Sequence, residues 1–204
     1  MRPASRLLVW FLGVAIAGPM SAAQVPSNIP ELADMPAGTQ RLAPVLLRFQ
    51  ADLDSVEHTH DITAGVDREN ALRGFYRGWQ ARLAELDPAT LGLEDQVDHA
   101  LLQRELAYRL TQLDFERTRW RQAEPLLPKV DALIALAEAR RALHYADARA
   151  SAATLDASRK ALADLQATIE RDRKSAPVQS PIVAFRAARL LDGVRSDLKD
   201  WYTF

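Results

Sequence analysis

The sequence predicts an all-α protein, a bundle of about six antiparallel helices joined by short loops. Of the 204 residues, 35 are Ala and 29 are Leu, both strong helix formers. Val, Ile and Thr together number only 26, which is too few for a sheet-rich chain. No glycine lies between Gly92 and Gly193, so a long stretch lacks the residue that hairpin turns usually need.

Residues 1–23 have the three parts of a secretory signal peptide. Arg2 and Arg6 make the start positive, residues 7–17 form an uncharged apolar run, and small residues at 21–23 suit cleavage. The run is shorter than the roughly 20 residues of a membrane-spanning helix, so an uncleaved anchor is the less favoured alternative. Residues 24–40 contain three prolines without a clear period, which predicts a linker or a surface arm.

Residues 41–204 are expected to form the helical domain, because apolar residues recur there three or four positions apart. The first two helices are expected at about 41–58 and 66–86. Pro88 ends the second of them, since the residue before a proline is pushed out of the α region.

The third helix, at about 94–122, is apolar on more than one face. Its main stripe consists of leucines, while Tyr108, Phe115 and Trp120 fall partly outside that stripe. Such a helix is expected to lie between neighbours. Pro125 ends it.

The last three helices are expected at about 129–146, 152–174 and 181–204. No Gly or Pro marks the break between the first two. A heptad-like series in the middle helix predicts lengthwise packing against a partner helix. Ser180 and Pro181 are a typical N-cap and first position for the last helix. The chain stops on aromatic residues, so the apolar stripe of this helix is expected to be exposed, as in a domain truncated at its C-terminal end.

Histidines give the only candidate metal site, and it is a weak one. His58 and His60 are close in sequence, but residues two positions apart on a helix point to different faces. A polar helix end is the preferred interpretation, and His99 and His144 are expected to serve in packing. The chain has no Cys, no His-Glu-x-x-His and no Gly-x-Ser-x-Gly motif. We therefore assign no catalytic, cofactor-binding or metal-ligating residue to this chain.

Aromatic and basic residues offer two further candidates for binding. Phe75, Tyr76 and Trp79 are interpreted as core, with a ligand pocket as the alternative. Two basic groups could bind an anion, but acidic residues among them favour a solvated, self-paired surface. These groups are Arg117, Arg119 and Arg121, and Arg171, Arg173 and Lys174. The net charge of −1 argues against nucleic acid as a partner.

Four short motifs occur in a fixed order along the helical domain. They are Phe75-Tyr76-x-x-Trp79-x-x-Arg82-Leu83, Gln96-Val97-Asp98-His99-Ala100-Leu101-Leu102 with Glu105-Leu106, Pro125-Leu126-Leu127-Pro128, and Ala187-Ala188-Arg189-x-Leu191 with Leu198-x-x-Trp201-x-x-Phe204. Their order resembles the bacterial family called domain of unknown function 885. Two positions depart from the family: His99 stands where tyrosine is frequent, and Lys129 where an apolar residue is usual.

The resemblance implies the helical N-terminal part of a longer, exported protein of the zinc-metallopeptidase type. In that family a His-Glu-x-x-His helix lies far downstream, so zinc would belong to the full-length protein and this chain would not be an enzyme by itself. Its partners would be its own C-terminal region or a peptide substrate, for which it would shape one wall of a cleft. The alternative is a self-contained periplasmic helical bundle that binds a partner or a small ligand.

Export is expected to remove residues 1–23 and to leave the chain in the periplasm or outside the cell, with no stable membrane anchor. N-terminal sequencing of the exported protein should therefore begin at or near Gln24. A protein that keeps Met1 and stays in the membrane fraction would instead show an uncleaved anchor.

Overall fold

The computed structural model describes residues 42–172 and 180–203, and all regular structure within them is helical. The predicted all-α class with about six helices is confirmed. The helices are α1 Ala43–Thr59, α2 Val66–Ala84, α3 Leu93–Ala123, α4 Val130–Arg141, α5 Ala148–Asp172 and α6 Pro181–Thr203, with 3₁₀ turns η2 Pro88–Thr90 and η3 Glu124–Leu126 on either side of α3. The expected signal peptide, 1–23, and the expected linker, 24–40, lie outside the described residues.

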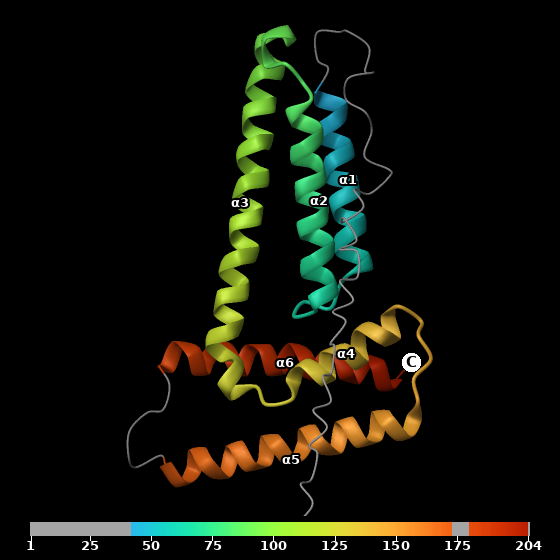
Figure 1. Cartoon of the computed structure of the whole chain (residues 1–204), viewed down its shortest axis with the longest axis vertical. Coiled ribbons are helices and arrows are strands. Elements are labelled where there is room, and N and C mark those ends of the chain that lie inside the picture. The colour runs from blue at the N-terminus through green and yellow to red at the C-terminus, as the bar shows by residue number, and fades with distance from the viewer. Residues whose placement is uncertain (1–41, 173–179, 204) are drawn as a thin grey trace, which may run out of the picture.

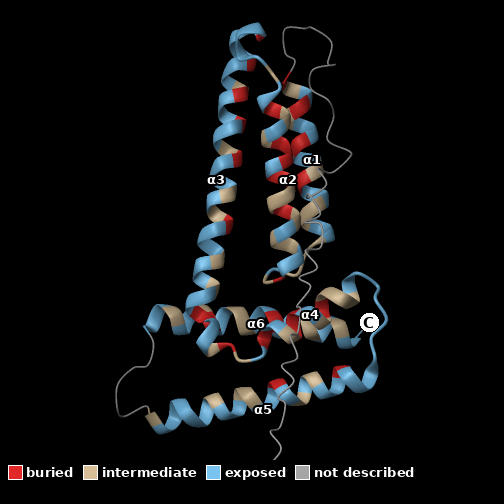
Figure 2. Cartoon of the chain, in the orientation of Figure 1, coloured by how far each residue is buried: buried red, intermediate tan, exposed pale blue. Residues whose placement is uncertain are grey.

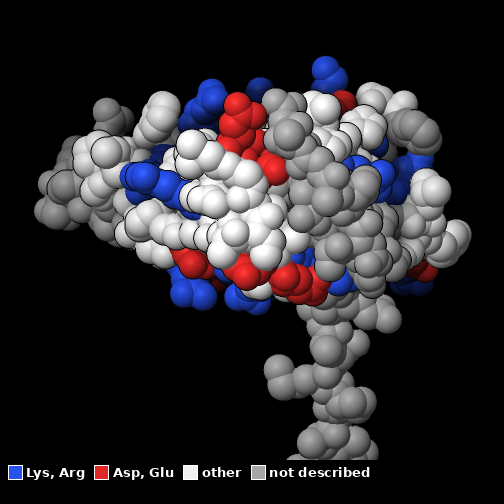
Figure 3. Space-filling view, turned by 90° about the horizontal axis from the view of Figure 1, so that it is seen from above, with Lys and Arg blue, Asp and Glu red and all other residues white. Residues whose placement is uncertain are grey.

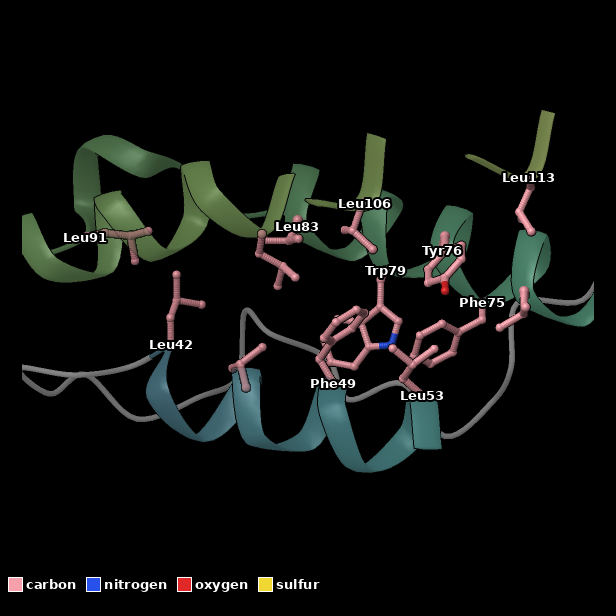
Figure 4. Packing of buried hydrophobic residues seen from close by; sticks show 13 residues of the cluster. Leu42, Phe49, Leu53, Phe75, Tyr76, Trp79, Leu83, Leu91, Leu106 and Leu113 are labelled. Carbon is pink, nitrogen blue, oxygen red and sulfur yellow. The ribbon is translucent and has the colours of Figure 1, made fainter. Parts of the chain in front are cut away.

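The first layer consists of α1, α2 and α3, which run alternately down, up and down beside one another (Figure 1). An aromatic cluster lies in the middle of its core (Figure 4). Phe49 stacks on Phe75 with ring centroids 5.5 Å apart, and the edge of Trp79 meets Phe49 at 5.4 Å. Trp79 is 0% exposed, so the interpretation of this aromatic group as core is correct.

Two buried polar side chains connect the upper ends of these helices. The N–H of Leu42 donates a hydrogen bond to Oδ1 of Asp95 over 2.9 Å, which links the start of α1 to the start of α3. His99 Nε2 lies 3.1 Å from the carbonyl oxygen of Leu83, near the end of α2. His99 is therefore a core residue with a structural partner, in agreement with the packing role expected for it.

The second layer consists of α4, α5 and α6, which cross below the first layer near the C-terminal end of α3 (Figure 1). A second core lies between α4, α6 and this end of α3. Ala123 at the end of α3 is fully buried in it, and Trp120 packs against it. The 31-residue α3 thus contributes to both cores.

α6 starts at Pro181, as the Ser-Pro signal predicts, but the exposed apolar stripe expected on this helix is wrong. Val194 is buried, and Leu191 and Leu198 pack against the second core. The reason is that α4 and the end of α3 cover this side of α6 within the chain itself.

α5 is covered by a partner helix over less of its length than its heptad-like series predicts. It is 25 residues long, whereas its neighbour α4 has only 12 residues and cannot cover its whole length. Ser151 and Ser158 are the buried residues of α5. Ser158 Oγ donates a hydrogen bond to the carbonyl of Lys129 over 3.4 Å, while Ile169 near the far end is 47% exposed.

α4 ends at Arg141 rather than near residue 146, and its end is formed without glycine. The N–H of Leu143 bonds to the carbonyl of Arg140 over 3.0 Å, and the N–H of His144 bonds to that of Ala139 over 2.9 Å. This is the Schellman arrangement, with Leu143 in the left-handed conformation at φ 56°. A leucine here gives no local signal of a helix end, which is why the prediction ran past it.

We expect Leu143→Gly to stabilise the protein by about 0.5–1 kcal/mol. Glycine adopts a positive φ without the steric cost that a Cβ brings, and little packing is lost because Leu143 is 86% exposed. Urea unfolding followed by circular dichroism measures the change. Leu143→Ala is the matched control, since it removes the side chain but keeps the Cβ, and it should leave the midpoint unchanged. A lower midpoint for the glycine variant would contradict the expected strain.

Candidate functional site

A groove of about 460 Å³ is lined by residues of α2, α3 and α6. Figure 1 shows these helices near the C-terminal end of α3, where α6 crosses it. Apolar side chains contribute to its lining, among them Leu72, Leu113, Trp120 and Leu190. Residues 63–65 of the loop between α1 and α2 line it as well. Its charged residues are six arginines and three glutamates: Arg68, Arg109, Arg117, Arg119, Arg186, Arg189, Glu57, Glu69 and Glu116.

Three of these arginines have acidic partners. Arg68 pairs with Glu57 at 3.4 Å, and Arg117 pairs with Glu69 at 3.5 Å. Arg109 pairs at 2.6 Å with Glu105, which lies outside the groove. The positive charge of this part of the groove is therefore largely balanced.

The other three arginines lie on α6 and the last turns of α3. Arg186 donates a hydrogen bond to the neutral side chain of Gln122 over 3.2 Å. Arg119 and Arg189 form no ion pair or side-chain hydrogen bond within the part of the chain that the structure describes. Glu116 is the acidic residue of the groove on this side. The guanidinium groups thus outnumber the carboxylates here, and guanidinium groups bind carboxylates and phosphates well.

A side chain from α4 holds the loop at the groove. Glu138 Oε1 accepts a hydrogen bond from the backbone N–H of Asp67 over 2.9 Å. It thereby takes the place of an N-cap side chain for α2, whose own N-cap residue is Gly65. A Cβ at Gly65 would overlap the Glu138 carboxylate and lie 2.9 Å from the carbonyl oxygen of Ile62. Only glycine leaves room for this contact.

Two arginines fix the same loop from other directions. Arg141 at the end of α4 forms an ion pair with Asp61, with its Nε 2.7 Å from Oδ1. Arg68 Nη1 donates hydrogen bonds to the backbone carbonyls of His60 at 2.7 Å and Glu57 at 3.2 Å. These carbonyls belong to the C-terminal end of α1, where a cation is favoured. The loop that lines the groove is therefore attached to α2 and to α4.

Burial changes the acidity of two groups next to these contacts. Burial raises the pKa of Glu138, and the N–H donors of Asp67 and Val66 offset this only in part. Burial likewise raises the pKa of the Tyr76 phenol, against an opposing effect of Arg109. Tyr76 lines the groove as a neutral side chain whose ring belongs to the first core.

The histidines that the sequence offered as metal ligands, His58 and His60, do not form a metal-binding group with other ligand side chains of the described residues. His58 is exposed in the last turn of α1, and His60 follows as its C-cap. His144 is exposed in the connection after α4. Among residues 42–172 and 180–203, no three His, Asp or Glu side chains are grouped so that they could hold a metal ion.

The two basic groups identified in the sequence lie at different places in the structure. Arg117 and Arg119 line the groove, but Arg121 is exposed outside it. Arg171 is exposed on α5, and the other two members of its group, Arg173 and Lys174, lie outside the described residues. Sequence analysis missed Arg186 and Arg189, which only the crossing of α6 over α3 brings beside Arg119.

Charged residues of both signs are also mixed on a second face of the described residues (Figure 3). On the face seen from above the first layer, acidic and basic side chains alternate around a central uncharged area (Figure 3). Among the described residues of that face, no continuous positive area of the kind that nucleic-acid binding requires is visible in Figure 3.

No family model, curated protein or solved structure matches the chain. The resemblance to domain of unknown function 885 accordingly stays a hypothesis based on the four motifs. None of the helices in the described residues is both long and apolar enough to cross a membrane.

We expect Glu138→Ala to lower the free energy of unfolding by about 1–2 kcal/mol, because the N–H of Asp67 loses its acceptor. Glu138→Gln keeps an acceptor oxygen and should cost less than about 0.5 kcal/mol. Since the pKa of Glu138 is raised in the fold, the folded wild type binds more protons than the unfolded chain above the ordinary carboxyl pKa. The wild type should therefore lose stability relative to Glu138→Gln as the pH rises from about 4 to about 7.

Urea unfolding of both variants across this pH range measures the effect. Gly65→Ala provides a coupling test, because its added Cβ overlaps the Glu138 carboxylate. It should destabilise the wild type more than it destabilises Glu138→Ala. Equal costs in the two backgrounds, or a wild type that gains on Glu138→Gln with rising pH, would contradict this account.

Proposed function

We propose that this chain is a peptide-binding helical module, and that its groove holds a ligand with an acidic group next to an apolar one. The observation that carries the proposal is the position of Arg119, Arg186 and Arg189 beside Trp120 and other apolar side chains. A carboxylate gains charge-assisted hydrogen bonds from the arginines, while an apolar side chain on the same ligand loses its contact with water.

The form of the site favours an extended ligand. Four helices and a loop contribute to the groove, so that it continues from residues 63–65 to Phe185 on α6. A peptide with one acidic residue and one or two apolar residues has both kinds of group at suitable spacing. Recognition of acidic motifs by arginines is also a common mode of peptide binding.

This proposal is consistent with both functions that the sequence leaves open. In the N-terminal region of an exported, peptidase-like protein, the groove would be one wall of the substrate cleft, with the chemistry performed elsewhere. Two observations support the role as part of an exported, peptidase-like protein. They are the four motifs and the signal-peptide pattern of residues 1–23, with its arginines, apolar run and small residues. In a self-contained periplasmic bundle, the same groove would bind the peptide as a ligand.

Binding can be tested by calorimetry with an N-acetylated peptide of sequence Leu-Glu-Leu-Glu-Leu. We expect it to bind, and its amidated counterpart with Gln for Glu to bind at least about 10-fold more weakly. The double variant Arg119→Gln/Arg189→Gln should lose about 10-fold or more in affinity for the acidic peptide. Added salt should weaken binding of the acidic peptide more than that of the neutral one.

Arg121→Gln is the matched control, since Arg121 lies on the same helix but outside the groove. It should bind the acidic peptide as the wild type does. Equal binding of the acidic and neutral peptides, or an equal loss in the control variant, would show that the groove does not recognise acidic ligands. No measurable binding of either peptide would remove the proposal.

A further inference from the structure

Tyr76 has a hydroxyl group without a hydrogen-bond partner in the part of the chain that the structure describes. Its ring belongs to the first core, where it meets Phe75 with ring centroids 5.6 Å apart, and the residue is only 2% exposed (Figure 4). Figure 2 shows α2 with buried residues along most of its length, as expected for a helix that packs on both α1 and α3. Buried hydroxyl groups are usually hydrogen-bonded, so this one indicates a partner from outside the fold.

The hydroxyl of Tyr76 belongs to the groove rather than to the core. Tyr76 lines the groove from α2. Four charged side chains act on the phenol, and three of them line the groove as well. They are Arg109, Glu57 and Arg68 in the groove, and Glu105 outside it. The side chain therefore has its ring in the core and its polar end in the groove, a division that is common for tyrosine at binding surfaces.

A second neutral side chain with unused hydrogen-bonding groups lines this end of the groove. Gln112 follows Arg109 by three residues on α3, so the two lie on the same side of that helix. The amide of Gln112 forms no hydrogen bond within the described residues. The nearby cations Arg68 and Arg109 already pair with Glu57 and Glu105. This end of the groove therefore offers neutral hydrogen-bonding groups beside charges that are paired.

The groove extends along α3 from this neutral end to the arginines at its other end. Its residues on α3 run from Arg109 to Trp120, which is about 16 Å at 1.5 Å per residue. Arg119 lies at the far end, where Arg186 of α6 donates its hydrogen bond to Gln122. An extended peptide advances about 3.3 Å per residue, so about five residues cover this length.

We propose that Tyr76 and Gln112 form a subsite for the backbone of the ligand, about four residues away from the acidic side chain that the arginines hold. This inference rests on the proposed function and adds the form and the length of the ligand. A peptide group has an N–H that donates and a carbonyl that accepts, and a phenol and a side-chain amide can each serve both. A second carboxylate suits this end less well, because Glu57 and Glu105 already neutralise the arginines there. The groove thus selects an extended peptide over a short acid, which would leave the hydroxyl and the amide without a partner.

Two N-acetylated, amidated peptides with one glutamate test this subsite by calorimetry. The short peptide is Leu-Glu-Leu, and the long one carries three further alanines at each end, so that it reaches four residues from the glutamate in either direction. The long peptide should bind the wild type at least about 10-fold more tightly than the short one. Tyr76→Phe should weaken binding of the long peptide about 3-fold or more and leave the short one unchanged. Tyr76→Phe/Gln112→Met should reduce the preference for the long peptide to less than about 2-fold.

Tyr108→Phe/Gln103→Met is the matched control, since it makes the same two changes on α3 at exposed positions outside the groove. It should bind both peptides as the wild type does. Tyr76→Phe should also unfold in urea at the wild-type midpoint or above it, because its hydroxyl has no partner within the described fold.

The results separate this subsite from the function on which it rests. Suppose that Arg119→Gln/Arg189→Gln weakens both peptides, but Tyr76→Phe weakens neither or weakens both equally. The subsite is then wrong, and the proposed function stands. If neither peptide binds, or if the arginine variant binds both as the wild type does, the subsite and the proposed function are both overturned.

Discussion

The arrangement of the two layers depends on the contact between the carboxylate of Glu138, on α4, and the first turn of α2. α3 contributes to the cores of both layers, but contact with this one helix would let the second layer turn about the axis of α3. Glu138 supplies another attachment, between residues 71 positions apart in the chain. Ile62 and Ala64 of the adjoining loop also pack on the second core, so α2 and α6 are held at a fixed separation. The groove between them exists because of this double attachment.

The groove brings arginines that have no acidic partner among the described residues next to apolar side chains. Elsewhere, several arginines pair with a carboxylate three or four residues away on the same helix, as Arg48 does with Asp52. Such exposed pairs contribute little to stability and leave little charge for a ligand. On α6, Arg186 has no carboxylate at helical spacing, and Asp192, three residues after Arg189, pairs with Arg195 instead. Both arginines line the groove together with Trp120. The local excess of positive charge thus comes from sequence spacing as much as from the crossing of helices.

Periodicity was sufficient for the fold class and for most helix bounds, because each helix buries one apolar face. It failed at Leu143, where a left-handed residue ends α4 without a glycine. Periodicity also led to the wrong expectation that the apolar stripe of the last helix is exposed. Spacing alone does not show that α4 and the end of α3 cover this face of α6. Arg117 and Arg119 were visible as a basic group, but Gly65 gave no hint of Glu138, because that contact depends on how α4 crosses α2.

The hydrogen bond between Asp95 and Leu42 determines how far α1 can slide along α3. Leucine side chains tolerate a shift by one helical turn of about 5.4 Å, since each finds another apolar neighbour. Asp95 is only 1% exposed, and such a shift would remove its partner on α1 at a cost of about 1–3 kcal/mol. His99 restricts α2 in the same way through the carbonyl of Leu83. The axial register of the three helices is therefore specified by two polar contacts together with the aromatic cluster of Phe49, Phe75 and Trp79.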